Sequence, residues 1–432
     1  MRKSKSNNNS LLKGWRKVKL GEVLSFIIDH RGKTPKKLGG NWSKHGIPAL
    51  SAKNIKDGRI VNENDIRFVN RELYEKWMPE KLEAGDILMT SEAPLGELFY
   101  LKSKTDYCLS QRLFGLRANI DILDSKFLYY YLLSPEGRHE LFRRISGTAA
   151  EGIRQAELRQ VEVIFPEDIN EQKRIASILS AFDDKIEVNN KIIKTLETMA
   201  REIFKEWFVR FKFPGWQKAK FVDSELGKIP EGWSVKQIKQ VATVQKGISY
   251  SSNEISEKPV GVPMLNLANF LRGGGFNPLG IKYYTGKWKE KDLVQAGDII
   301  VAMTDLTSNR EVIGHPARVP KYSYWDKIVI SLDVCVVKTK EVLRGFLHYL
   351  MMRKDFAFRM ASSASGTNVA HLSKSVIEDY NFVLPSQDLM EKFNALVAPV
   401  FATKNIYELE NQKLATFRDL LLPKLMNGEI KL

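Results

Sequence analysis

The stretch from Pro166 to Phe213 constrains the fold more than any other part of this chain, because it has the pattern of one long helix. Asp168 is placed to act as an N-cap with Glu171 three residues later, and no Gly or Pro follows before Pro214. Eight residues then recur at alternating steps of four and three, the spacing of a coiled-coil seam: Phe182, Ile186, Asn189, Ile193, Leu196, Ala200, Ile203 and Trp207. About forty helical residues span roughly 60 Å, so this helix needs a partner helix.

The partner is predicted at the other end of the chain, in residues 385–432, whose pattern loosely repeats that of residues 166–213. We expect the two helices to pack as an antiparallel coiled coil. Asn189 is the polar member of the seam, and it either fixes the register or lies at a wet edge. Pro399 has no counterpart in the first helix, so a kink or a break is expected there.

The rest of the chain is predicted to form two α+β units, residues 14–165 and 214–384, related by tandem duplication. The same short markers occur in both units in the same order, at offsets from 212 (296 minus 84) to 219 (365 minus 146). These markers are Gly-Trp at 14 and 232, Ile/Val-Pro at 47 and 262, Ala-Gly-Asp-Ile at 84 and 296, and Ser-Gly-Thr at 146 and 365. Between the markers the sequences differ greatly, which indicates one task performed on two different targets.

Short apolar runs bounded by Gly, Pro and Asn predict the strands of the first unit, and a run of aromatic and aliphatic residues predicts its helix. The expected strands are 17–28, 47–52, 86–90, 98–101, 108–116 and 161–165. The expected helix is 125–133, which Pro135 ends, and a second short helix continues to Arg144.

Charge indicates a polyanionic partner. The chain of 432 residues carries a net charge of +16 (67 minus 51), and residues 1–60 alone hold fifteen Lys and Arg against three Asp and Glu. This excess fits a nucleic-acid-binding face, and it equally fits a solubilising surface with a disordered basic tail over residues 1–13.

Other classes are disfavoured by the composition. The basic, polar start has no apolar core of a signal peptide, and no apolar run reaches membrane-spanning length. Two distant cysteines, Cys108 and Cys335, suggest neither a disulfide nor a metal framework, so a cytoplasmic location is expected. The six histidines do not cluster at metal-ligand spacing, and no phosphate-binding loop is present. Asp183 and Asp184 are better explained as a solvated helix face than as nuclease carboxylates.

The chain resembles the specificity subunit of type I restriction–modification systems. The residues that carry the resemblance are Val163–Pro166 with Glu171–Ala176, Ile203–Val209, the two Ala-Gly-Asp-Ile turns, both Ser-Gly-Thr loops, and Arg418–Leu425 with Asn427–Ile430. The resemblance covers essentially the whole chain beyond the basic tail. One departure is Glu92, an acidic residue where the family usually has a more neutral turn.

The resemblance implies that each globular unit is a target recognition domain that reads one half of a split, asymmetric sequence in double-stranded DNA. The helix pair would set the spacing between the halves and dock two modification (methyltransferase) subunits, which bind S-adenosylmethionine and methylate adenine. Restriction subunits would join for ATP-driven translocation and cleavage. The chain itself would then be non-catalytic, with no cofactor and no metal, and with no membrane partner.

Loop residues with Arg, Lys, Asn, Ser, Thr or Tyr side chains are the candidates for DNA contact, because such groups bind phosphates and base edges. In the first unit they are Arg31, Lys33, Lys36, Lys37, Asn54, Arg112 and Arg154. In the second unit they are Lys246, Tyr250, Ser251, Asn253, Asn266, Asn269, Arg272, Thr304 and Arg310. A solvated turn is the competing explanation for each of them, and at Thr148 and Thr367 of the Ser-Gly-Thr loops a structural role is favoured.

Two other functions remain as alternatives. A stand-alone DNA-binding regulator without a methyltransferase partner would show polar helix faces outside the seam. An autonomous DNA methyltransferase is disfavoured, because its Asn-Pro-Pro-aromatic motif is missing and the nearest string is Asn277-Pro278-Leu279.

Overall fold

The computed structural model describes residues 12–145, 151–306, 310–366 and 369–432. The chain divides into two compact units, one formed by residues up to Ile186 together with Gln412–Leu432, and the other by Glu187–Asn411. The two long helices therefore belong to both units. This division differs from the expected one, in which the helices were separate from the globular parts. The predicted tail, residues 1–13, lies almost wholly outside the described residues, as do Thr148 and Thr367.

The first unit is built on a four-stranded antiparallel sheet with the order β2-β10-β7-β8. A second, three-stranded sheet has the order β6-β3-β9, and the pairs β1-β11 and β4-β5 complete the unit. The strands are β1 (Trp15–Lys19), β2 (Leu24–Asp29), β3 (Ile47–Leu50), β4 (Ile55–Lys56), β5 (Arg59–Ile60), β6 (Arg67–Val69), β7 (Ile87–Thr90), β8 (Leu98–Tyr100), β9 (Cys108–Leu109), β10 (Leu113–Ala118) and β11 (Glu162–Pro166).

The helices of the first unit are short, and three of them have a side-chain N-cap. They are α1 (Leu20–Val23), α2 (Arg71–Trp77), α3 (Ser125–Leu133), α4 (Pro135–Phe142) and α5 (Gln155–Arg159). Asp124 caps α3 by accepting from the Phe127 N–H, and Ser134 caps α4 by accepting from the Gly137 N–H. The predicted helix 125–133 is thus confirmed. The predicted strand 17–28 is wrong in one respect, because α1 interrupts it with one helical turn.

The second unit repeats this architecture, with a four-stranded sheet of the order β15-β24-β20-β22 and a five-stranded sheet of the order β16-β18-β17-β23-β19. Its strands are β12 (Phe221–Ser224), β13 (Gly227–Pro230), β14 (Ser234–Gln237), β15 (Ala242–Lys246), β16 (Ile255–Ser256), β17 (Val262–Leu265), β18 (Lys282–Tyr284), β19 (Leu293–Val294), β20 (Ile299–Ala302), β21 (Thr304–Asp305), β22 (Pro316–Arg318), β23 (Ile328–Ile330), β24 (Val334–Thr339), β25 (Ala370–His371) and β26 (Asn381–Leu384). Its helices are α7 (Glu341–Met351), α8 (Lys354–Ser362) and α9 (Lys374–Glu378).

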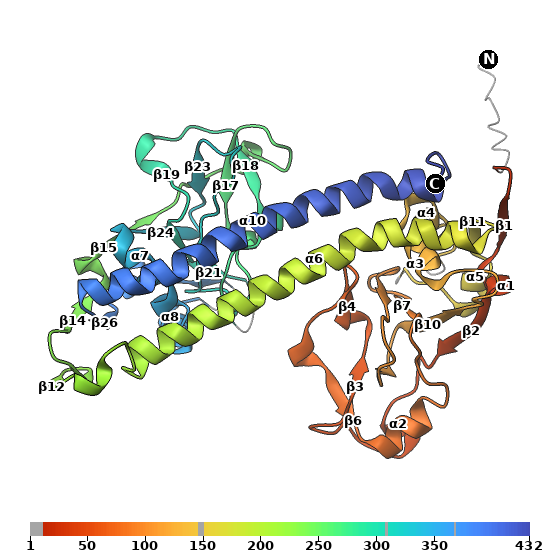
Figure 1. The fold of residues 1–432 in the computed structure, drawn as a ribbon, viewed down its shortest axis with the longest axis horizontal. Coiled ribbons are helices and arrows are strands. Elements are labelled where there is room, and N and C mark those ends of the chain that lie inside the picture. Colours follow the sequence, from red (N-terminus) through yellow and green to blue (C-terminus); the bar gives the residue numbers. More distant parts are fainter. Residues whose placement is uncertain (1–11, 146–150, 307–309, 367–368) are drawn as a thin grey trace. The chain divides into compact units, whose positions relative to one another are not determined.

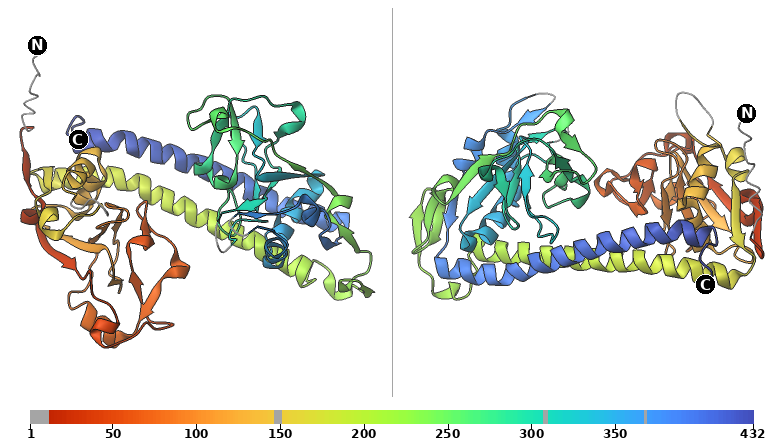
Figure 2. Two further views of the ribbon diagram at one scale, coloured as in Figure 1. Left: turned by 180° about the vertical axis from the view of Figure 1, so that it is seen from behind. Right: turned by 90° about the horizontal axis from the view of Figure 1, so that it is seen from above.

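Each unit is followed by a long helix, α6 (Ile169–Phe204) after the first and α10 (Gln387–Met426) after the second (Figure 1). A π-helical turn, Lys205–Val209, extends α6. Both helices are unbroken in the further views (Figure 2). The break expected at Pro399 is therefore wrong, because α10 continues through this exposed residue. Asp168 accepts from the Asn170 N–H, as the predicted N-cap requires.

The long helices contribute to the core of each unit. In the first unit Leu179 of α6 and Leu425 of α10 lie in one apolar cluster with Phe127 of α3. In the second unit Phe204 of α6 and Phe393 of α10 are buried in a cluster with the sheet and α7. Phe208 is buried in this second cluster, and the partly buried Trp207 packs against it. No residue of the predicted seam is exposed, which is consistent with a buried helix face.

Candidate nucleic-acid interface

Most of the predicted contact residues lie at one end of the central sheet of their unit. In the first unit β2 ends at Asp29, β7 ends at Thr90 and β10 begins at Leu113, and the register joins Phe114 to Asp29 and Leu113 to Thr90. The loops 30–46, 91–97 and 110–112 therefore leave from the same edge. Residues 152–154 join them, because the Ile153 N–H donates to the Ser91 carbonyl (2.9 Å). We call these segments the first rim.

The same edge exists in the second unit. Here β15 ends at Lys246, β20 ends at Ala302 and β24 begins at Val334, and the register joins Lys246 to Cys335 and Ala302 to Val334. The second rim consists of loops 247–254 and 331–333, the described residues of 303–315, and residues 370–373. The last segment is attached because the Leu372 N–H donates to the Met303 carbonyl (2.8 Å).

In the basic loop of the first rim, some cationic side chains bond within the unit and others are exposed. Arg31 donates from Nε and Nη2 to the Asp29 carboxylate (2.8 and 2.9 Å) and from Nη1 to the Ile153 carbonyl (3.2 Å). Its guanidinium also lies 4.0 Å from the Phe114 ring centroid. These contacts engage Arg31 within the unit, so its donors are poorly placed for phosphate.

The three lysines of the same loop differ in exposure and in the hydrogen bonds that their ammonium groups make within the unit. Lys33 donates to the Trp77 carbonyl (2.9 Å). Burial, followed by the charge of Lys33, lowers the pKa of His30. Lys37 is exposed and donates to the Gly32 carbonyl (2.8 Å). Lys36 is exposed, and no side-chain partner is found for it among the described residues. Lys36 is therefore the best placed of the four cations for a phosphate contact.

Two arginines complete the first rim. Arg112 has a positive φ of 66°, and its Nε lies 2.9 Å from Oε1 of Glu92. Arg154 is exposed at the N-cap of α5. Both guanidiniums are accessible, so both stay predictions for DNA contact.

The second rim is less basic and richer in hydroxyl groups. Lys246 and Asn253 are exposed, and Tyr250 is 41% exposed. Ser251 donates from its backbone N–H and its hydroxyl to the Glu254 carboxylate (2.8 and 3.0 Å). Burial, followed by the charge of Asp333, raises the pKa of Tyr250. These loop residues can offer hydrogen bonds to bases.

Two further predicted residues of the second rim are engaged within the unit. Thr304 is 6% exposed and donates to Oδ1 of Asp333 (3.0 Å). Arg310 donates to the Ala361 carbonyl (2.5 Å). Thr304 therefore bears on DNA recognition only through the carboxylate that it holds.

The prediction that Asn54 and Asn269 contact DNA is wrong, because the two residues are only 1% and 0% exposed. Asn54 accepts from the Ser51 N–H (3.0 Å) and donates to the Val61 carbonyl (3.3 Å). Asn269 accepts from the Asn266 N–H (2.8 Å) and donates to the Asn277 carbonyl (3.0 Å). The two amides perform the same structural task, and a sequence signal existed: Pro-x-Leu followed by Asn four positions later occurs in both units, at 48–54 and 263–269.

Asn266 and Arg272 are not part of the rim segments, although Arg272 pairs with Glu311 of the second rim. The Asn266 amide is used locally, because it donates to the Gly280 carbonyl (2.9 Å) and accepts from the Ala268 N–H (2.9 Å). Arg272 is 65% exposed and pairs with Glu311 at 3.1 Å. Asn266 is thus engaged locally, whereas Arg272 stays a prediction for DNA contact beside the second rim.

Sequence reasoning missed three polar residues of the rims, namely Glu92 as a partner of Arg112, Asp333 and His371. His371 is exposed and pairs with Thr304 across β21 and β25. A signal for Asp333 was present, since Leu109-Ser110 and Ile330-Ser331 precede β10 and β24 by the same distance. An alignment of these pairs would have matched Arg112 of the first unit with Asp333 of the second unit.

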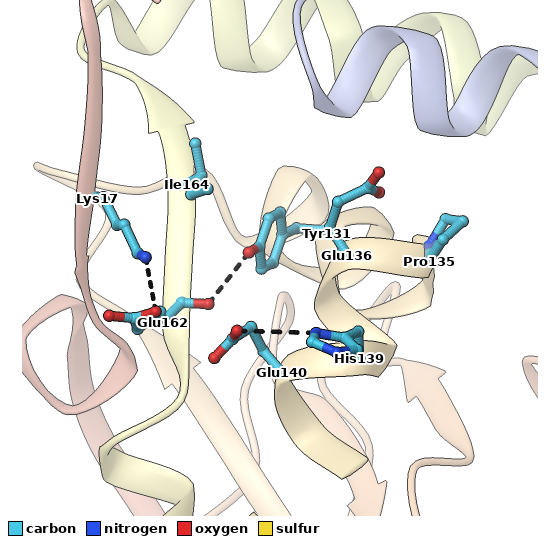
Figure 3. Close-up of a pocket in the computed structure, with 8 residues that line it drawn as sticks. All are labelled: Lys17, Tyr131, Pro135, Glu136, His139, Glu140, Glu162 and Ile164. Atoms are coloured by element: carbon cyan, nitrogen blue, oxygen red, sulfur yellow. Dashed lines mark hydrogen bonds and ion pairs between the residues drawn. The ribbon is translucent and has the colours of Figure 1, made fainter. Parts of the chain in front are cut away.

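A pocket of about 360 Å³ lies in the first unit between β1, β11 and α4, away from the rim (Figure 3). Glu136, Glu140 and Glu162 line it, together with Lys17, Tyr131, Pro135, His139 and Ile164. The Lys17 ammonium pairs with Glu162 at 2.7 Å, and the Tyr131 hydroxyl donates to the Glu162 carbonyl at 3.1 Å. Three carboxylates make this pocket a poor site for nucleic acid.

Two general tests bear on other chemistry. Within the described residues, no group of three or more His, Cys, Asp or Glu side chains is arranged to hold a metal ion. None of the described helices is both long enough and apolar enough to cross a membrane.

Polar contacts join α6 and α10 within each unit. In the first unit Arg418 pairs with Asp183, which also accepts from the Tyr130 hydroxyl (2.6 Å). In the second unit Asn189 is 0% exposed and donates to Glu410 (2.9 Å) and Asn411 (2.8 Å). The burial of Asn189 and its two bonds favour the register interpretation over a wet edge.

The family follows from comparison with known proteins. A model of the type I restriction modification DNA specificity domain matches residues 12–198 and 230–393. The chain belongs to this family. The resemblance seen in the sequence is thereby confirmed, and so is the coarse architecture of two specificity domains of mixed helix and sheet.

Relatives in this family span nearly the whole chain. The type I restriction enzyme MjaIX specificity subunit of Methanocaldococcus jannaschii is 30% identical over 363 residues, covering 80% of this chain and 78% of the relative. The MjaVIII specificity subunit of the same organism is 25% identical over 430 residues, covering 96% and 93%. The crystal structure of a type I restriction–modification S subunit from M. genitalium matches with a TM-score of 0.57 at 18% identity and covers 97% of each chain, which supports the shared fold.

Proposed function

We propose that this chain is the DNA sequence-specificity subunit of a type I restriction–modification complex, in which each unit reads one half of a split, asymmetric DNA target. The observation that carries the proposal is the pair of equivalent rims: two units of one family share a frame and present different polar loops at the same sheet edge. A frame that is repeated with different loops suits two different half-sites.

We propose further that α6 and α10 pack as an antiparallel coiled coil that sets the spacing between the half-sites. Support comes from the seam, whose eight residues are all buried or partly buried, and from the polar contacts of Asn189 and of Asp183 with α10. In the first unit Asp183 pairs with Arg418, whereas in the second unit Asn189, later in α6, bonds to Glu410 and Asn411, which come earlier in α10. This order of contacts is that of an antiparallel pair.

The outer faces of the same helices are proposed to dock two modification subunits, to which restriction subunits are added. Apolar side chains on these faces are left open to solvent: Met199 (55%), Ile406 (65%), Phe417 (55%) and Leu420 (60%). Such residues are expected on a surface that a partner covers. They weigh against the stand-alone regulator, for which polar outer faces were expected.

Catalysis is assigned to the partners. In this proposal the modification subunits bind S-adenosylmethionine, the restriction subunits use ATP, and this chain in the cytoplasm contributes recognition alone. Support is indirect: the family is one of DNA specificity domains, and the rims carry hydrogen-bonding and basic side chains.

Co-purification from the native host followed by native mass spectrometry tests this proposal. The expected result is a complex with two copies of a methyltransferase-sized partner for each copy of this chain. A lone chain that binds its DNA site tightly without a partner would contradict the proposal and favour the stand-alone regulator. Phe417→Glu tests the docking face. The variant should lose the partner and keep the unfolding midpoint of wild type, because Phe417 is 55% exposed.

A further inference from the structure

The same backbone position carries opposite charges in the two rims. Arg112 directly precedes β10, and Asp333 directly precedes β24. The Arg112 carbonyl accepts from the Ser91 N–H (2.8 Å), and the Asp333 carbonyl accepts from the Met303 N–H (2.8 Å). The registers of both sheets place these residues at equivalent points, one step before the pairs Leu113–Thr90 and Val334–Ala302.

The side-chain partners are equivalent as well. Arg112 lies 2.9 Å from Glu92, which is two residues beyond Thr90. Asp333 accepts from Thr304 (3.0 Å), which is two residues beyond Ala302. In each unit, therefore, one charged side chain at the sheet edge contacts a side chain two residues beyond the end of the neighbouring strand.

Residues that the frame requires are kept the same in both units, and this position is not. Asp86 and Asp298 both accept from a backbone N–H three residues earlier, of Glu83 (2.8 Å) and of Gln295 (2.9 Å). The buried amides of Asn54 and Asn269 are a second such pair. An exchange of Arg for Asp at a matched point is thus not explained by folding, and it suits a point where the two targets differ.

The surroundings of Asp333 suit a residue that contacts a DNA base. Among the described residues it makes no ion pair, although the chain has a net charge of +16. Thr304 occupies Oδ1 and holds the side chain in place, and the ring of the 41%-exposed Tyr250 lies near enough for the charge of Asp333 to raise its pKa. A carboxylate at a DNA surface repels phosphate, so it is tolerated where it accepts from a base.

We propose that Asp333 accepts a hydrogen bond from an exocyclic amino group, cytosine N4 or adenine N6, in the half-site of the second unit, whereas Arg112 donates to guanine in the other half-site. This inference rests on the proposed function. The chemistry follows from the groups, because an ionised carboxylate only accepts and a guanidinium only donates.

Selection from a randomised duplex library tests the inference, using the full-length chain in complex with its modification subunit. Wild type should select a split motif, and the selection of one base pair in the second half-site should depend on Asp333. Asp333→Ala should lose the preference at that position and keep the other half of the motif, with a loss of roughly 5- to 150-fold for the best duplex. Asp326→Ala is the matched control, an exposed aspartate before β23 and far from the rim end of that strand, and it should leave the motif unchanged.

Modified duplexes separate the two bases. If the selected base is adenine, purine in its place removes N6, and if it is cytosine, pyrimidin-2-one removes N4. Either change should weaken wild type and leave Asp333→Ala without further loss. Asp333→Asn keeps an acceptor for Thr304, and where wild type selects cytosine this variant should shift the preference toward adenine.

The outcomes are distinct. A split motif in wild type that is unchanged in Asp333→Ala overturns this inference alone. Where the alanine variant does not fold, the inference is overturned if no removal of an amino group from the second half-site weakens the binding of wild type. A wild-type complex that selects no motif overturns the proposed function and this inference together.

Discussion

Glu408 gives a stability prediction with a definite sign. It lies on α10 with its side chain 13% exposed, and it faces the Lys404 ammonium at 3.6 Å. Lys404 also pairs with Glu197 of α6, so two carboxylates share one ammonium. Burial raises the pKa of Glu408 from 4.5 to about 7; the charge of Glu197 adds to this rise, and Lys404 opposes it.

The sign follows from proton linkage. The pKa of Glu408 is higher in the folded state than in the unfolded chain, so the folded state binds the proton more tightly between pH 4.5 and about 7. The stabilisation is complete below pH 4.5 and is lost as the pH rises to about 7. A shift of about 2.5 pH units corresponds to about 3 kcal/mol of the free energy of unfolding.

Glu408→Gln tests this contribution, since it removes this one titrating group with almost no change in side-chain size. We expect the variant to unfold at a higher urea concentration than wild type at pH 8, and at nearly the same concentration at pH 5. The difference in the free energy of unfolding should change by about 3 kcal/mol across this range. Glu391→Gln, an exposed residue of the same helix, is the control and should leave the profile unchanged. Parallel profiles for wild type and Glu408→Gln would refute the reasoning.

Three further predictions concern other parts of the chain. Lys36→Ala should reduce the salt slope of DNA affinity by about 1, whereas Lys173→Ala on α6 should not; equal slopes would remove Lys36 from the interface. Asn54→Ala should destabilise the first unit by about 1–3 kcal/mol in urea unfolding and leave the DNA motif unchanged, and an altered motif would show that the amide has a reading role. Asn189→Leu should keep or raise the unfolding midpoint but yield mixed association states in sedimentation, and one state as in wild type would exclude a register role.

The fold was largely predictable because its signals are local or periodic. Asp124, Ser134 and Pro135 set the bounds of two helices, and the four-three spacing from Phe182 to Trp207 marked the buried face of α6. The break predicted at Pro399 is wrong, because a helix that is held by tertiary contacts can continue through a proline that faces solvent.

The site was less predictable, because the position of a residue in a loop does not show whether its side chain is buried or bonded within the unit. Arg31 and Lys36 share one basic loop, yet the first is bound to Asp29 and the second is free of described partners. Asn54 and Asn269 look like reading residues until their burial is known. The equivalence of Arg112 and Asp333 had only a short sequence signal, the pairs Leu109-Ser110 and Ile330-Ser331, and the strand registers of the structure establish it.

Sequencing the DNA methylation pattern of the host with and without this chain tests the central claim most directly. The account predicts that an adenine-methylated, asymmetric motif of two parts separated by a fixed spacer disappears when the chain is removed. Methylation that does not depend on this chain, or a single uninterrupted motif that does, would contradict the claim that each unit reads its own half of the target.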